Sequence, residues 1–258
     1  MYHGKAMAEA TFRFYAELND FLPPERRFAE FACEFADIVT VKDRIESFGV
    51  PHTEVDLILV NGVPADFAYR LRDGDRVSVY PVFESFDIAG LARLRPEPLR
   101  DPKFILDAHL GRLAAFLRMV GFDALYENNC DDRTLAEVSR ERRLILLTRD
   151  VGPLKRGAVT HGYFVRETDS RRQLAEVVRR FDLARLARPF SRCMRCNALL
   201  EPATLEEAME KAPPRAAARY RDFRQCRPCG RVYWPGSHYA RMLRLIEESC
   251  QPSAIGGQ

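Results

Sequence analysis

Two Cys-x-x-Cys pairs constrain the fold of this chain more than any other feature of its sequence. Cys193 pairs with Cys196, Cys226 pairs with Cys229, and 29 residues separate the two pairs. Each pair forms a tight knuckle that presents two thiolates to one ion, and four thiolates make a closed tetrahedral zinc site. Because a closed site leaves no position for a substrate, we expect this zinc ion to be structural. A redox function would instead need a single pair in a thioredoxin-like context.

The gap between the pairs is longer than the roughly 15–20 residues of a common zinc ribbon. Residues 204–210 predict an inserted helix, which two prolines follow. We expect the zinc ribbon module to span 189–246 and a flexible tail to span 247–258. Three further cysteines are isolated, and we interpret them as small buried or incidental residues: Cys33, Cys130 and Cys250.

Charge divides the chain into two unlike parts. Residues 1–90 carry 9 Lys or Arg and 16 Asp or Glu, net −7, whereas residues 91–258 carry 31 and 21, net +10. A basic body suggests a polyanionic partner such as nucleic acid, although the arginine-rich composition that a GC-rich genome encodes gives the same excess. No apolar run approaches the roughly 20 residues that cross a bilayer, and no long apolar signal core begins the chain. We expect a cytoplasmic protein with reduced thiols and no membrane partner.

The first segment, 10–90, has the pattern of a small domain with strands around one helix. Residues 11–15 alternate as a strand does, 41–48 predict a short helix closed by Gly49, and 56–62 predict a strand entering an Asn-Gly hairpin turn. A second turn and a strand follow at 71–81. The three prolines Pro96, Pro98 and Pro102 then indicate a linker over 91–102.

The middle segment, 103–188, alternates strands and helices. Strands are predicted at 103–107, 123–126, 143–150 and 162–166, with helices at 110–120, after Asp131 and at about 170–182. This alternation favours a parallel sheet with helices on both faces, an α/β/α arrangement.

Acidic residues follow two of the predicted strands. Asp107 and Asp150 come at the carboxyl ends of their strands, the edge where open α/β sheets bind ligands. Asp131 or Asp132, at a helix N-terminus, lies in position to reach the same crevice. Converging carboxylates favour a divalent cation, Mg²⁺ or Mn²⁺, which polarises a phosphoryl oxygen and activates water.

Each acid also has a simpler interpretation. Asp131 or Asp132 suits a helix cap and Asp150 an Asx turn. Nearby cations are candidates for holding a phosphate backbone: Arg112, Arg118, Arg149, Lys155 and Arg156. Beyond the second knuckle, Trp234 would either stack on an unpaired base or pack the ribbon. His238 would contact phosphate, cap a helix or be buried.

Three stretches together resemble a known family. They are FILDAHLGRLAAFLRMVGFDALY (104–126), DDRTLAEVSRERRLILLTRD (131–150) and CGRVYWPGSHY (229–239). They are similar to the PIN-like RNase domain named for the C-terminus of Mut-seven exonucleases, whose pattern continues into the zinc ribbon. The resemblance implies RNA hydrolysis by clustered aspartates, here Asp107, Asp131 or Asp132, and Asp150.

The N-terminal segment has a resemblance of its own. VNGVPADFAYRLRDGDRVSVYPVF (60–83) looks like the end of a β-grasp, ubiquitin-like domain of the sulfur-carrier type. The carriers end in Gly-Gly, whereas this domain continues into Glu84–Ile88, and the chain's own Gly256-Gly257 follows the zinc module. We therefore expect this domain to bind a protein partner.

Three functions follow from these patterns. The acids at strand ends favour a metal-dependent ribonuclease. PIN nucleases often have a fourth acid shortly after the third, and here none follows Asp150 until Glu167, which favours a non-catalytic RNA-binding adaptor. A sulfur-carrier-like interaction protein is the third hypothesis.

Overall fold

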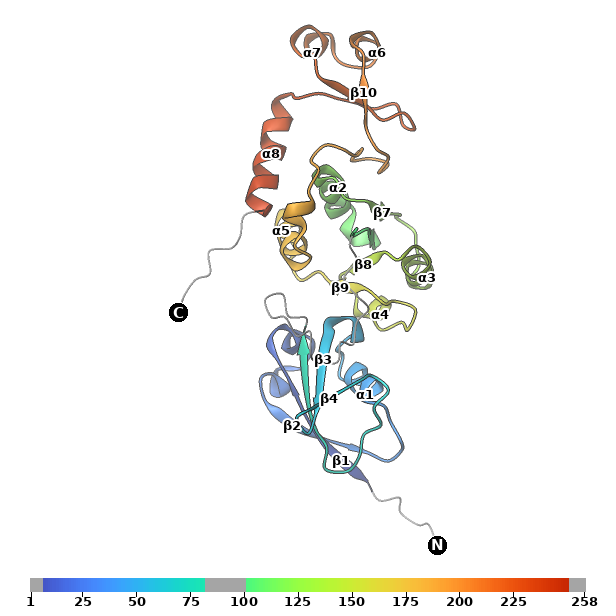
Figure 1. The fold of residues 1–258 in the computed structure, drawn as a ribbon, viewed down its shortest axis with the longest axis vertical. Helices are drawn as coiled ribbons and strands as arrows, with labels where there is room; N and C mark the ends of the chain where they lie inside the picture. Colours follow the sequence, from blue (N-terminus) through green and yellow to red (C-terminus); the bar gives the residue numbers. More distant parts are fainter. Residues whose placement is uncertain (1–6, 82–100, 251–258) are drawn as a thin grey trace. The chain divides into compact units, whose positions relative to one another are not determined.

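The computed structural model describes residues 7–81 and 101–250, with the side chain of His238 left out (Figure 1). Most of the predicted linker, 91–100, and the end of the predicted tail, 251–258, lie outside the described residues.

The N-terminal domain is a five-stranded sheet with one α-helix. The strand order is β2-β1-β5-β3-β4, in which β1 is parallel to β5 and the other neighbours are antiparallel. The strands are β1 (Ala8–Phe14), β2 (Glu30–Phe35), β3 (Val55–Val60), β4 (Val63–Ala65) and β5 (Arg76–Pro81), and the helix is α1 (Val41–Ser47). Short 3₁₀ helices lie at η1 (Ala16–Phe21), η2 (Pro24–Arg26) and η3 (His52–Glu54).

Local chemistry explains these elements. Asn61 and Gly62 join β3 to β4 with positive φ values of 53° and 82°, which suits a tight primed hairpin turn. Thr40 caps α1 by accepting a hydrogen bond from the Asp43 N–H. Alternate residues of β1 point inward, so Phe12 and Phe14 pack with Ile45 of α1 in a single core.

The central sheet has the strand order β7-β6-β8-β9. Strand β6 (Phe104–Leu106) is parallel to both β7 (Ala124–Tyr126) and β8 (Ile145–Thr148), and β9 (Gly162–Phe164) follows β8 in the sheet. All residues of β6 and β8 are buried, as expected for strands covered on both sides. The helices are η4 (Ala108–Leu110), α2 (Gly111–Val120), α3 (Asp132–Arg142), α4 (Val151–Leu154), α5 (Ser170–Arg180) and η5 (Leu183–Leu186).

Gly121 ends α2 in a left-handed conformation, φ 111°. A β carbon at this position would lie 2.3 Å from the carbonyl oxygen of Arg188, so the site requires glycine for space as well as for conformation.

The C-terminal module has a three-stranded sheet, β10 (Glu201–Ala203), β11 (Phe223–Gln225) and β12 (Val232–Tyr233), with both neighbouring pairs antiparallel. The predicted insertion contains α6 (Leu205–Met209), closed by a Thr204–Glu207 capping box, and also a second helix, α7 (Pro214–Arg219). The last helix is α8 (Ser237–Cys250). The expected fold class, a ubiquitin-like sheet domain, a parallel-sheet domain and a cysteine ribbon, is confirmed.

The chain packs as two compact units. The first contains the N-terminal domain with residues 132–143 and 150–164, and the second contains residues 101–131, 144–149 and 165 onward. Among the described helices, none has the length and apolar character needed to span a membrane.

Candidate active site and metal centre

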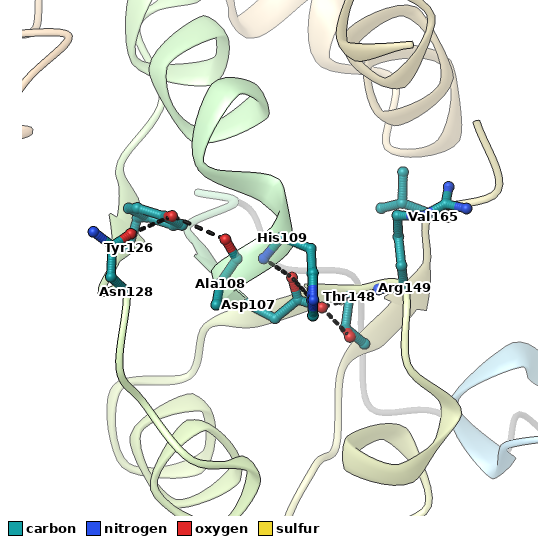
Figure 2. A network of polar contacts seen from close by, with 8 residues as sticks. All are labelled: Asp107, Ala108, His109, Tyr126, Asn128, Thr148, Arg149 and Val165. Atoms are coloured by element: carbon teal, nitrogen blue, oxygen red, sulfur yellow. Dashed lines mark hydrogen bonds and ion pairs between the residues drawn. The ribbon is translucent and has the colours of Figure 1, made fainter. Parts of the chain in front are cut away.

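Asp107 directly follows β6, caps η4, and is held in place by three hydrogen bonds (Figure 2). Its Oδ1 accepts from the His109 N–H at 2.9 Å, and its Oδ2 accepts from the Arg149 N–H at 3.0 Å and from the Thr148 hydroxyl. The residue is only 7% exposed. A carboxylate has about four acceptor positions, so these donors leave about one, on Oδ1, for another partner.

The parallel sheet explains why Thr148 donates to Asp107. Leu106 of β6 lies opposite Leu147 of β8, so the next residues, Asp107 and Thr148, leave the sheet side by side at its carboxyl edge. The sequence prediction placed Asp107 at this edge but did not single out Thr148. Its position, as the polar last residue of the buried neighbouring strand, is the signal that identifies it.

The surroundings of Asp107 contain further polar groups that the sequence did not single out. The exposed His109 ring places Nδ1 at 3.8 Å from Asp107 Oδ1. The Tyr126 hydroxyl donates to the Ala108 carbonyl and contacts Asn128 Oδ1 (Figure 2). Gly111 lets the Tyr126 ring lie against the start of α2, since a β carbon there would be 2.6 Å from the ring.

Asp132 and Asp150 lie together within the first compact unit. Asp150 caps α4 by accepting a hydrogen bond from the Gly152 N–H at 2.9 Å. A β carbon built on Gly152 would lie 3.4 Å from Asp150 Oδ1 and 3.6 Å from Asp132 Oδ2. The two carboxylates therefore face the same small region beside Gly152. Asp131 is exposed and precedes α3.

The candidate phosphate-binding cations have different surroundings. Arg118 is 6% exposed and donates to the carbonyls of Ala124, Met194 and Arg195. Arg149 donates to the carbonyls of Val165 and Arg166 at 3.1 and 2.9 Å and to that of Glu167. Of the five candidates, Arg112 and Arg156 are exposed.

The segment that follows Asp150 is bound by the N-terminal domain within the same compact unit. Lys155 Nζ donates to the Glu46 carbonyl at 2.8 Å, and the Phe164 N–H donates to the buried Glu54 carboxylate at 2.7 Å. His52 lies between Glu46 Oε1, at 2.6 Å from its Nδ1, and the Val159 carbonyl, at 3.0 Å from its Nε2. The N-terminal domain thus contacts residues 155–164 through three polar groups.

The four knuckle cysteines gather as a metal site requires. Their sulfurs lie within 4.8 Å of one another, with Cys193 and Cys229 at 3.6 Å and Cys196 and Cys226 at 3.3 Å. Tetrahedral zinc with bonds of about 2.3 Å separates its sulfurs by about 3.8 Å, so the cluster is close to the size of this ion.

The proton affinities of the cluster also fit a cation. Burial raises the pKa of Cys193, but hydrogen bonds from the Tyr233 hydroxyl and the backbone of Cys196 and Arg195 outweigh burial and bring the pKa to about 6. The pKa of Cys226 is raised, mainly by burial and also by hydrogen bonds with neighbouring thiols. The Cys193 thiol therefore loses its proton easily, whereas the Cys226 thiol holds its proton. A bound divalent cation would favour the thiolate form of both, because it neutralises several thiolates together.

The first knuckle is also attached to the central sheet. Asn197, in a left-handed conformation with φ 70°, accepts a hydrogen bond from the Ala124 N–H at 3.1 Å and donates to Asp123 at 2.6 Å. Arg118 joins the same two elements through the carbonyls described above. Trp234, partly buried, packs in the cluster around Phe223, and His238 belongs to α8 without a described side chain.

A family model agrees with this layout. The model described as the Mut7-C RNAse domain matches residues 102–246, more than half of the chain. The chain belongs to the Mut7-C RNAse domain family. A second model, the Mut7-C ubiquitin domain, matches residues 7–87, so the family resemblance and the ubiquitin-like N-terminal domain are both confirmed. Neither the curated proteins nor the solved structures include a match to this chain.

Membership of the Mut7-C family connects the geometry to a class of chemistry. The match begins just before β6 and ends within α8, so one family unit includes Asp107, Asp132, Asp150 and all four cysteines. The family description indicates a nuclease-like protein, and the cysteine cluster provides a possible zinc site within it.

Proposed function

We propose that this Mut7-C protein is a metal-dependent ribonuclease that uses Asp107, Asp132 and Asp150. The Asp107 carboxylate carries the proposal, because three protein donors fix it at the carboxyl edge of a parallel sheet. Such an edge is where α/β folds bind ligands. The remaining acceptor position on Oδ1 suits a single bond to a hard cation.

The other residues have supporting roles in this proposal. Asp132 and Asp150 supply further carboxylate oxygens, and the exposed Arg112 and Arg156 are the cations free to hold RNA phosphates. When bound, Mg²⁺ or Mn²⁺ polarises a phosphoryl oxygen and lowers the pKa of a water molecule. Zinc at the cysteines is structural, because four thiolates leave no open coordination position.

The test compares cleavage of labelled single-stranded RNA by the parent protein and by Asp107→Asn. Divalent ions should be omitted and then added back, because a strong chelator would also remove zinc from the cysteines. We expect cleavage only with Mg²⁺ or Mn²⁺, and a loss of about 100-fold or more in Asp107→Asn. Equal cleavage by the two proteins would make Asp107 a structural residue.

A second function, a non-catalytic RNA-binding adaptor, is favoured by one observation. No acidic residue follows Asp150 until Glu167, so the acid that often comes fourth in PIN nucleases has no counterpart nearby. The adaptor function predicts that RNA binds but stays intact with every divalent ion. Binding measured beside cleavage separates the two functions.

A further inference from the structure

A cavity of about 400 Å³ lies among residues of α2, α5 and α8, and its lining includes none of the candidate aspartates or knuckle cysteines. Helix α8 packs against α5 (Figure 1), and α5 packs against α2. The cavity is lined by Phe116, Arg171, Arg241, Met242, Arg244, Leu245 and Glu248. All of these residues belong to the second compact unit.

The rim of the cavity is basic. Arg171, Arg241 and Arg244 are exposed, and within the described residues none of their guanidinium groups has a hydrogen-bond or ion-pair partner. Glu248 is the one acid among the lining residues, so the lining carries a net charge of +2. Unpaired guanidinium groups grouped around a hollow attract anions and suit phosphate oxygens, which they bind through paired donors.

The floor of the cavity is apolar. Phe116, Met242 and Leu245 are partly buried, so each retains surface that solvent reaches. A ligand that fits both rim and floor combines an anionic group with a flat, weakly polar face, as a nucleotide does. Single-stranded RNA exposes its bases in this way, whereas a duplex keeps them stacked inside.

The position of Phe116 relates the cavity to Asp107. Asp107 precedes η4, which leads directly into α2, and Phe116 lies five residues after the first residue of α2, about 8 Å along its axis. Arg112 is one helical turn before Phe116, so the two side chains share a face of α2. The exposed Arg112 thus adds a positive charge on this face of α2, one turn nearer to Asp107 than Phe116 is.

We propose that this cavity binds a nucleotide of single-stranded RNA, with its phosphates on Arg171, Arg241 and Arg244 and its base against Phe116 and Leu245. The proposal rests on the proposed function in one respect, since it assigns the substrate of the Asp107 site as single-stranded rather than duplex RNA. Binding at the cavity itself requires no cleavage.

The test is fluorescence anisotropy with a labelled single-stranded oligoribonucleotide and a duplex of equal length, without added divalent ions and at several salt concentrations. The variant is Arg241→Glu with Arg244→Glu in the full chain. The control is Arg70→Glu with Arg72→Glu, which makes the same change in net charge on exposed residues of the N-terminal domain. Thermal unfolding of each variant checks that it is folded.

We expect the cavity variant to bind the single strand about tenfold or more weakly than the control variant does. The slope of the logarithm of its affinity against the logarithm of salt concentration should become shallower by about 1.4. Each single-strand phosphate contact contributes about 0.7 to this slope, and the variant removes two contacts. Phe116→Leu keeps an apolar floor but removes the aromatic face, so affinity should fall while the salt dependence stays unchanged.

Three results would overturn the proposal. Equal affinity of the cavity and control variants for the single strand would exclude the cavity as an RNA site. An equal loss for single strand and duplex would exclude the single-strand assignment, and an unchanged Phe116→Leu would exclude the base contact. Failure of the ribonuclease proposal alone would give another result: the parent would bind single-stranded RNA more tightly than the cavity variant does, but no divalent ion would support cleavage.

Discussion

Thr148 shows how much a single hydroxyl group can contribute at the residue scale. It is fully buried and donates to Asp107 Oδ2, so it orients the carboxylate without lying in position to contact RNA. Thr148→Val keeps the shape of the side chain and removes only this donor. We expect cleavage to fall about 10–100-fold, the usual loss when a residue that orients a metal ligand is changed.

The matched control for Thr148 is Thr168→Val, because Thr168 is exposed and lies between β9 and α5. Cleavage rates at saturating Mn²⁺ and the Mn²⁺ dependence of each variant should be measured together. A positioning role predicts that only Thr148→Val binds Mn²⁺ more weakly, so that this variant alone needs a higher Mn²⁺ concentration for half-maximal cleavage. If both variants cleave as the parent does, the orientation of Asp107 does not depend on this hydroxyl.

Asp131 and Asp132 are adjacent acids with different surroundings. Asp132 Oδ2 lies beside Gly152 together with Asp150, whereas Asp131 is exposed ahead of α3. We expect Asp132→Asn to reduce cleavage about 100-fold or more, and Asp131→Asn to retain it at a cost in stability of about 1 kcal/mol or less. Parallel measurements of cleavage and thermal unfolding decide the assignment, and the reverse pattern would transfer the role to Asp131.

At the element scale, the N-terminal sheet fixes the segment that follows Asp150. Glu54 is 1% exposed and accepts a hydrogen bond from the Phe164 N–H of β9. The Phe21 and Phe164 rings also pack edge to face, with their centroids 5.4 Å apart. Glu54→Met fills the same space but leaves this N–H without its acceptor, which costs about 1–3 kcal/mol. We expect faster hydrogen exchange in residues 155–164.

The control for Glu54→Met is Glu34→Met, which changes an exposed residue of the edge strand β2 by the same chemistry. Exchange in 155–164 should stay at the parent rate in this variant. Equal exchange of the segment in both variants would show that the Glu54 contact does not hold it in solution.

Elements with regular patterns could be predicted from the sequence. The Asn-Gly turn, the Thr40-capped helix and the buried strands at 103–107 and 143–150 follow from local propensity and periodicity, and they place Asp107 at the sheet edge. The surroundings of the charged side chains could not be predicted. Arg118 and Arg149 donate hydrogen bonds to carbonyls that are distant along the chain, and such pairs leave no periodic signal in the sequence.

At the scale of the whole molecule, the cysteine ribbon and the strands β6, β7 and β8 of the central sheet belong to one compact unit. Asn197, next to the first knuckle, bonds Ala124 of β7, and Arg118 of α2 donates to knuckle carbonyls. Strand β7 is the edge of the central sheet and extends it beside β6. A well-ordered first knuckle therefore supports hydrogen bonds made by β7. This strand is the neighbour of β6, which Asp107 follows.

Removing zinc should consequently affect β7 as well as the ribbon. Cys226→Ser removes one of four thiolates, and zinc binding supplies much of the folding free energy of such a module. We expect less than one zinc per chain by elemental analysis, and faster hydrogen exchange in both knuckles and in residues 124–126. Cys250→Ser, at an isolated cysteine, should keep its zinc and the parent exchange rates. If the ribbon loses protection in Cys226→Ser while β7 keeps it, the bonds of Asn197 and Arg118 do not couple the two. If zinc content is unchanged, the four cysteines are not the site that holds it.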